Sequence, residues 1–186
     1  MSRSGDVGLL VLRLSVGGSL VAHGVQKLFG WFGGAGLEET GEMFHKIGFR
    51  PGKLNAVAAG LGEAGGGALL AAGLGTPGAG AAAAGTMVVA SSMHTANGFY
   101  VSKGGFEYPA VLGAGALGLA LTGPGALSLD HVLRHRLNRG WMRALAISAV
   151  VPAAGVVIAR RRRAVAGTPP NPEADSPAAP EVDTET

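Results

Sequence analysis

The chain has 186 residues, of which 47% are hydrophobic and only 15% are charged, and its mean hydropathy is +0.33. Soluble domains average nearer a quarter charged residues, so this composition argues against an ordinary cytosolic enzyme and for a membrane protein. The absence of cysteine excludes disulfides, thiolate metal sites and thiol exchange by this chain.

Charge is divided unevenly along the chain. Residues 1–163 carry all 15 basic residues, whereas residues 164–186 carry none and hold five of the 12 acidic ones. The basic residues lie at the ends of apolar segments, as expected of anchors that meet anionic lipid. They do not form the aromatic-interleaved surface typical of nucleic-acid binding. We therefore expect the lipid bilayer as a partner, and no nucleic acid.

Four apolar segments in residues 1–133 predict four transmembrane helices. The first runs from about residue 7 to 29, which is too long for the core of a signal peptide and lacks its cleavage pattern. Segments 54–74 and 79–96 are joined by a predicted turn at residues 75–78, which makes them an antiparallel hairpin. The fourth, 108–121, ends at the helix breaker Gly123-Pro124-Gly125. Between the first two segments, residues 38–47 predict a short interfacial helix.

The C-terminal part predicts one short and one long helix. Ser128 or Asp130 would cap a short amphipathic helix. A fifth apolar segment, 141–159, has a basic linker before it and four arginines, 160–163, after it. The positive-inside rule would place both basic flanks in the cytoplasm. A single span between them would instead place the two flanks on opposite sides of the membrane. Either four spans or five, with the arginine run inside, would satisfy the pattern. Residues 164–186 are Pro- and acid-rich and predict a disordered tail.

These segments together predict the fold class and its division. We expect an all-α polytopic transmembrane bundle of four core spans, with a fifth C-terminal span left open. Residues 1–133 would form the bundle, 134–163 a basic linker with an additional helix, and 164–186 the tail. Gly62 and Gly66 form a G-x-x-x-G pattern in which small side chains let helices approach closely. That pattern indicates either packing inside one bundle or the face of a homo-oligomer.

Polar side chains within the apolar segments are the candidate functional residues, because ionisable groups in a bilayer usually face a partner or a cavity. His23 and Lys27 share one helix face and are either interfacial anchors or a polar pocket for a quinone oxygen, a headgroup or an anion. Glu63 is either half of an ion pair with Arg13 or Lys27, or a carboxylate that accepts a proton. The candidate ligand or proton site comprises Arg13, His23, Lys27, Glu63, His94 and Asn97.

Several other chemistries are weaker fits to these residues. His94 and Asn97 could simply make interfacial hydrogen bonds. His23 and His94 could act as axial haem ligands, which would require that their helices face each other. Of the two candidate cofactors, a quinone is favoured over haem. The sequence contains no complete metal-ligand cluster and no nucleophile–base set, so we assign no catalytic residue and no metal.

The order of these polar residues resembles the DoxX family of small bacterial membrane proteins. The similarity covers roughly residues 7–133. It rests on an arginine in the first span, His23-Gly24-x-x-Lys27-Leu28, Glu63-Ala-Gly-Gly-Gly, His94 with Asn97, Gly105-Phe-Glu107, and Gly123-Pro-Gly-x-x-Ser128-x-Asp130. The resemblance adds Glu107, Ser128 and Asp130 as family-pattern loop residues.

The resemblance implies four transmembrane helices in the bacterial plasma membrane and a link to redox chemistry. Relatives are associated with a thiosulfate:quinone oxidoreductase, and others with complexes that contain superoxide dismutase and a sulfurtransferase. The resulting leading hypothesis is a redox-associated membrane subunit that binds a quinone or another lipid-soluble ligand and docks soluble redox or stress-response proteins. It would be at most one subunit of an oxidoreductase. The alternatives are a non-catalytic scaffold for such partners, or a small proton-coupled transporter with Glu63 as its coupling carboxylate.

Overall fold

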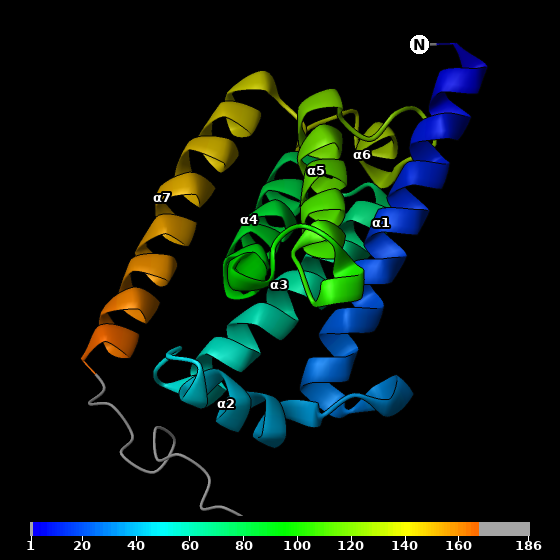
Figure 1. Ribbon diagram of the computed structural model, residues 1–186. Helices are drawn as coiled ribbons and strands as arrows, with labels where there is room; N and C mark the ends of the chain where they lie inside the picture. The colour runs from blue at the N-terminus through cyan, green and yellow to red at the C-terminus, as the bar shows by residue number, and fades with distance from the viewer. Residues whose placement is uncertain (1, 168–186) are drawn as a thin grey trace, which may run out of the picture.

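The computed structural model describes residues 2–167, and these residues form only helices, turns and loops. Five long helices run alternately up and down beside one another (Figure 1). The apolar runs in the sequence account for all five, so the predicted all-α class is confirmed. The long helices are α1 (Arg3–Phe29), α3 (Gly52–Ala72), α4 (Thr76–His94), α5 (Glu107–Thr122) and α7 (Gly140–Ala166).

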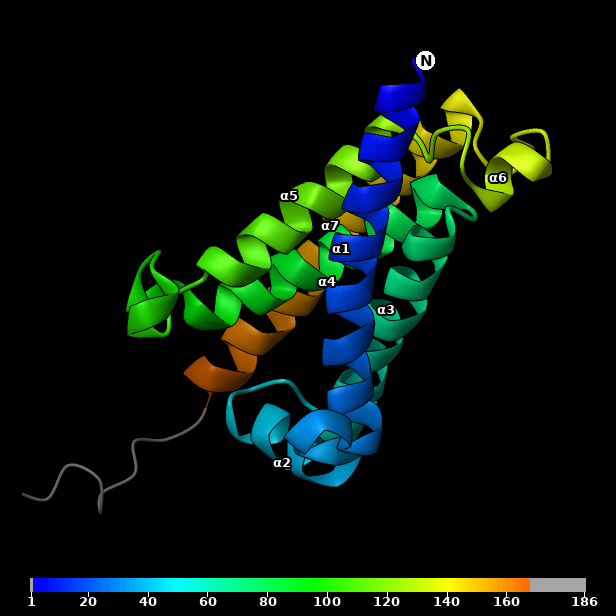
Figure 2. The ribbon, with the colours of Figure 1, turned by 90° about the vertical axis from the view of Figure 1, so that its right-hand side faces the viewer.

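The two short helices lie at opposite ends of this bundle (Figures 1 and 2). They are α2 (Gly36–Lys46) and α6 (Leu129–Val132). Short 3-10 turns, Trp31–Gly33, Thr95–Asn97 and Val101–Lys103, shape the loops at the α2 end. The chain therefore has an end that carries α2, which we call the α2 end, and an end that carries α6, which we call the α6 end.

Two of the long helices are long and apolar enough to cross a membrane. These are α1 and α7, each of 27 residues. Helix α5 has only 16 residues, and the glycines and polar side chains of α3 and α4 lower the mean hydropathy of these two helices. The four predicted core spans therefore stay a prediction, although the helices that would form them are present.

Helices α1 and α3 pack backbone against backbone through glycine. A methyl group on Gly17 would lie 2.5 Å from the carbonyl oxygen of Gly67, and one on Gly24 would lie 2.7 Å from that of Gly60. Both pairs are seven residues apart on their helices, so they fix one antiparallel register. Neither site can hold a larger side chain without separating the helices.

The G-x-x-x-G pattern of α3 faces α4 rather than α1. A methyl group on Gly62 would lie 2.6 Å from Oγ1 of Thr86, and one on Gly66 would lie 3.4 Å from the carbonyl oxygen of Ala79. The pattern thus serves packing within the bundle, which is the first of its two predicted roles. The homo-oligomer face stays a prediction.

The turns follow the sequence with one shift. The predicted turn at residues 75–78 lies earlier, because Gly73 and Gly75 adopt positive φ and α4 already begins at Thr76. Pro77 fits in the first helical turn, where its missing N–H leaves no partner unsatisfied. Ser128 caps α6 as predicted, since its Oγ accepts from the N–H of His131 at 3.2 Å.

Helix α7 is longer than the predicted segment 141–159. It continues through the four arginines to Ala166, so residues 164–166 are helical, and their inclusion in the predicted disordered tail is wrong. Ala and Val simply extend the helix until Gly167 ends it. The rest of that predicted tail, residues 168–186, lies outside the described residues. The basic linker before α7 and the arginine run at its end lie at opposite ends of the bundle (Figure 1).

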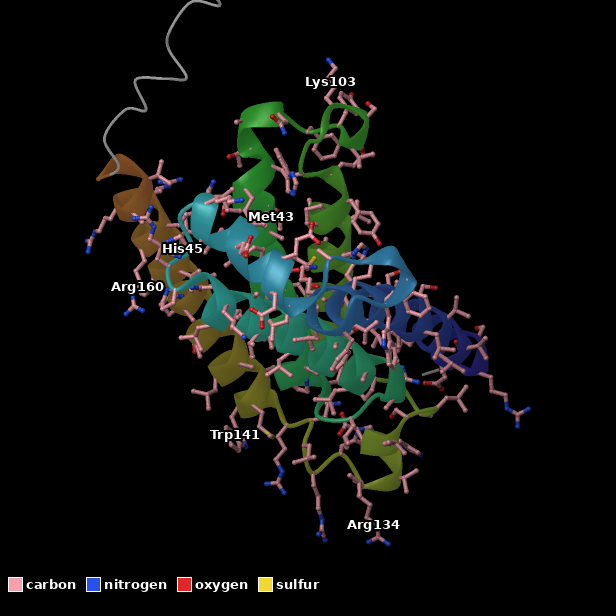
Figure 3. All side chains as sticks on the ribbon, turned by 90° about the horizontal axis from the view of Figure 1, so that it is seen from below. Met43, His45, Lys103, Arg134, Trp141 and Arg160 are labelled. Atoms are coloured by element: carbon pink, nitrogen blue, oxygen red, sulfur yellow. The ribbon has the colours of Figure 1, made fainter. Side chains whose placement is uncertain are left out.

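The short helix predicted over residues 38–47 is present as α2, and its position at the membrane interface stays a prediction. Its Phe44 packs with Phe49 and Ala56 in a small core of its own. Seen from the α2 end, α2 crosses the bundle, with Met43 over its middle and His45 toward Arg160 of α7 (Figure 3). Helix α2 therefore covers one end of the space between the long helices.

Candidate functional site

A cavity of about 440 Å³ lies between the helices toward the α2 end. Helices α4 and α5 lean away from α1 and α3 at their 94–107 end (Figure 2), where the cavity forms. Its walls come from α1, α2, α3, α4, α5 and α7 and are mostly apolar, with the larger side chains being Met43, Phe44, Phe49, Met87, Val89, Met93, Leu112 and Val157. Its volume lies within the ~300–1,000 Å³ typical of small-molecule pockets.

Four of the six candidate site residues line this cavity. They are His23 and Lys27 from α1, Glu63 from α3 and His94 from α4. Three separate helices thus bring their polar groups to one cavity. The sequence identified these residues as one candidate site but did not show where they lie in space.

Lys27 and Glu63 form the charged part of the wall. Nζ of Lys27 lies 2.6 Å from Oε2 of Glu63 and also donates to the carbonyl oxygen of His23 at 3.4 Å. The Glu63 side chain is only 3% exposed and that of Lys27 is 23% exposed. Of the two ion pairs predicted for Glu63, the one with Lys27 is therefore correct and the one with Arg13 is wrong. Oε1 of Glu63 has no hydrogen-bond partner within the described part of the chain.

His23 is held by a tyrosine from α5. Its Nε2 lies 3.0 Å from Oη of Tyr108, and the two rings meet edge to face with centroids 5.2 Å apart. Tyr108 also lines the cavity. This pair ties α1 to α5 at the polar wall.

His94 and Asn97 fasten a loop beside the cavity. Nδ1 of His94 lies 2.9 Å from the carbonyl oxygen of Gly104, and Nδ2 of Asn97 donates to the same oxygen at 3.1 Å. A carbonyl only accepts, so Nδ1 of His94 carries the proton, and in the neutral ring Nε2 is the acceptor. Asn97 does not line the cavity and acts on the loop alone. Both residues thus make hydrogen bonds to the loop, and whether this loop lies at a membrane interface stays a prediction.

Arg13 lies elsewhere, at the α6 end. It is fully buried, and its Nη2 donates to the carbonyl oxygen of Leu127. Asp130 is buried near it and accepts three hydrogen bonds, from the N–H of Gly75 and from the N–H and Oγ1 of Thr76. Asp130 therefore caps the start of α4, not α6. Arg13, Ser128 and Asp130 belong to this second cluster.

Glu107 also has a local task. Its Oε2 accepts from the N–H of Val101 at 3.0 Å, which shapes the loop before α5. Of the loop residues with the family pattern, none lines the cavity.

Three polar residues of the cavity were missed by sequence reasoning: Asn55, Thr86 and Tyr108. Tyr108 had a usable signal, because it opens the fourth apolar segment directly before Pro109 and aromatic residues with a polar tip favour the membrane interface. Asn55 and Thr86 had none, since single amide and hydroxyl groups are common on helices.

The wall can make several kinds of polar contact with a bound molecule. The Lys27 ammonium and the Tyr108 hydroxyl can donate, Oε1 of Glu63 can accept, and Nε2 of His94 can exchange a proton. No group of three or more metal-ligating side chains occurs within residues 2–167. The arrangement suits a mainly apolar molecule with a polar, hydrogen-bonding end.

Comparison with known proteins agrees with this description. Residues 8–96, just under half of the chain, match the family model DoxX. No curated relative and no solved structure matches the chain. The matched range holds most of α1 and all of α2, α3 and α4, and with them all of the charged and imidazole groups of the cavity. Together with the two apolar helices, the match indicates a membrane protein and supports the similarity to the DoxX family that its motifs predict.

Proposed function

We propose that this chain is a multi-pass protein of the bacterial plasma membrane that binds a lipid-soluble ligand in the cavity at the α2 end. A quinone is the leading ligand, and the chain would serve as the membrane subunit of a redox system. Helices α1, α3, α4 and α5 would be the four core spans, with α7 as a fifth. The single observation that carries this proposal is the polar wall of an otherwise apolar cavity, formed by His23, Lys27 and Glu63 with His94 and Tyr108.

The chemistry of the wall matches what quinone reduction requires. Negative charge grows on the quinone oxygen as electrons arrive from a partner protein, and a fixed ammonium such as Lys27 stabilises it in a site that excludes water. Glu63 or His94, after taking up a proton from outside the cavity, would pass one proton to that oxygen. Tyr108 would orient His23, and where Nε2 of His23 donates to Oη, the Tyr108 O–H stays free as a second donor at the same wall.

The test is the ligand content of protein purified in mild detergent. We expect a reduced-minus-oxidised spectrum, together with solvent extraction, to detect quinone in near-stoichiometric amount. H23Q and E63Q should lose most of it while still inserting into the membrane. H45Q and E107Q are matched controls, because neither residue lines the cavity, and both should keep the ligand. Equal quinone content in all five proteins would refute the proposal.

A proton-coupled transporter is the second candidate. The observation that favours it is the unpartnered Oε1 of the nearly buried Glu63, which could take up and release a proton. Proton-dependent flux of a lipophilic solute into liposomes, lost in E63Q and kept in E107Q, would replace the quinone assignment. Absence of flux with quinone bound would exclude transport.

A further inference from the structure

A buried arginine at the α6 end has two donors without a hydrogen-bond partner. Arg13 is only 1% exposed, and its Nη2 is engaged by the carbonyl oxygen of Leu127. Its Nε and Nη1 have no hydrogen-bond partner among residues 2–167, although both are shielded from solvent. Nearly all buried donors in proteins are paired, and an uncompensated buried charge is costly. Two donors of this guanidinium therefore remain without a hydrogen-bond acceptor.

The acidic side chains at this end are already engaged. Asp130 is fully buried and accepts hydrogen bonds at 2.9 to 3.1 Å from Gly75 and Thr76. Asp6 accepts at 2.8 Å from the N–H of Ala126. Within the described residues, neither carboxylate comes within 4.0 Å of the Arg13 guanidinium. Asp130 acts on Arg13 only through space.

A shallow cavity, open to the surface, adjoins Arg13. Apart from Arg13 and Ser128 its walls are apolar, and Leu129 and Val132 of α6 form an exposed part of them, with Val132 74% exposed. A guanidinium in such a setting suits an oxyanion, because each of its free N–H groups can donate a charge-assisted hydrogen bond to a phosphate-type oxygen. The exposed apolar rim would tolerate hydrocarbon attached to that oxyanion.

We propose that Arg13 binds a phosphate-type oxyanion in this cavity, supplied either as the headgroup of an anionic phospholipid or as free inorganic phosphate. Nε and Nη1 are covered in the unliganded protein, so binding requires movement of residues 124–128, whose Leu127 carbonyl holds Nη2. This site is independent of the quinone cavity, since the two share no lining residue.

The test uses the full-length protein and two probes. Thermal unfolding in detergent is measured with inorganic phosphate against chloride at equal ionic strength. Lipid binding is measured by native mass spectrometry after exposure to vesicles of phosphatidylglycerol or phosphatidylcholine. We expect at least one anionic probe to bind and to raise Tm, with about tenfold weaker binding or more in R13Q. R3Q, an exposed arginine on the same helix, should bind like wild type.

The two arms identify the source of the oxyanion. Binding of phosphate alone assigns a free-anion site, and binding of phosphatidylglycerol but not phosphate assigns a headgroup site. If R13Q does not fold, hydrogen exchange of wild type decides, because either ligand should change the exchange of residues 124–128. Absence of any anion-dependent change in wild type, or an equal response in R13Q and wild type, overturns the proposal.

Discussion

Lys27 and Glu63 illustrate how strongly one buried charge depends on its neighbour. The Glu63 side chain is almost completely buried, whereas Lys27 keeps some access to its surroundings. Removing Lys27 would leave a buried carboxylate with neither of its oxygens hydrogen-bonded, whereas neutralising Glu63 leaves a lysine that can still reach outward. The two halves of this pair should therefore differ in their mutational cost.

We accordingly expect K27M to destabilise the protein by roughly 3 kcal/mol and E63Q by clearly less. The measurement is thermal unfolding of the purified protein. Glu38 and Lys53 provide the control, because their ion pair is mostly exposed, at 78% and 60%, and E38Q should change stability by less than about 1 kcal/mol. A K27M protein as stable as wild type would contradict this account of the pair.

The sequence alone predicted most of the polar residues that line the cavity. It did not predict whether Arg13 or Lys27 would be the partner of Glu63. Arg13 and Lys27 lie on similar faces of α1, yet 14 residues separate them by about 21 Å along the helix. Only one of them can meet Glu63. The choice depends on the register of α3 against α1, which the close approach of Gly17 to Gly67 sets. A single sequence does not reveal which glycines will meet, so both pairings were open.

At the scale of elements, small residues decide how close the helices come. Gly17 and Gly18 are neighbours on α1 with opposite surroundings. Gly17 touches the α3 backbone, whereas a methyl group on Gly18 would meet nothing within 4 Å. This pair separates packing from intrinsic helix preference, since both positions lie in the same helix turn.

We expect G17A to destabilise the bundle by about 1–3 kcal/mol through overpacking. G18A should be neutral or slightly stabilising, because alanine is the better helix former by roughly 1 kcal/mol. Thermal unfolding of the two variants side by side checks this. Equal melting temperatures would mean that α1 and α3 do not pack through Gly17.

Arg161 attaches the end of α7 to the rest of the bundle. Its Nε donates to the carbonyl oxygen of Ile47 at 3.1 Å and its Nη1 to that of Ser92 at 3.0 Å. Its guanidinium also lies over the Phe49 ring, 5.4 Å from the centroid. Arg161 thus has a structural role, although the run of four arginines in the sequence does not indicate which of them makes specific contacts.

R161A should therefore loosen the C-terminal half of α7, at a cost of about 1–2 kcal/mol. Hydrogen exchange of residues 155–166 should speed up in this variant. R162A, which alters an exposed neighbour, should leave exchange at its wild-type rate. Equal acceleration in both variants would show that only the total charge matters.

At the scale of the whole molecule, the helices place the loops at two opposite ends. The loop between α4 and α5, which holds Lys103, and the C-terminal end of α7, which holds Arg160, belong to the α2 end, whereas Arg134 lies just after α6 at the other end (Figure 1). If the bundle spans the bilayer, these ends face different compartments. The lack of native cysteine makes the chain a clean background for site-specific labelling.

In cells, an impermeant maleimide should therefore label K103C and R160C from the same side and R134C from the other. The measurement is labelling of intact against permeabilised cells. Labelling of R160C on the same side as R134C would mean that α7 does not span the membrane. That result would leave four spans, the other arrangement compatible with the charge pattern.

The sequence was sufficient to predict how many long helices the chain forms. Long apolar runs that end at helix-breaking residues, such as residues 123–125, are typical of helices and not of strands. Their ends were less predictable. Pro77 reads as a turn but lies in the first turn of α4, and Ala164 to Ala166 prolong α7. The cavity itself was beyond prediction, because it depends on how far α4 and α5 lean from α1, which no local pattern encodes.

The brevity of α5 has a consequence for the surrounding lipid. Its 16 residues make a rod of about 24 Å, whereas the hydrocarbon layer of a bilayer is about 30 Å thick. Hydrophobic mismatch of this size is relieved when the adjacent leaflet thins toward the shorter helix. The first turns of α5 supply Tyr108, Pro109 and Leu112 to the cavity wall. The thinned leaflet would therefore bring headgroups and water close to the cavity, so that an amphiphile could enter from the bilayer with its polar end already at the depth of the polar wall.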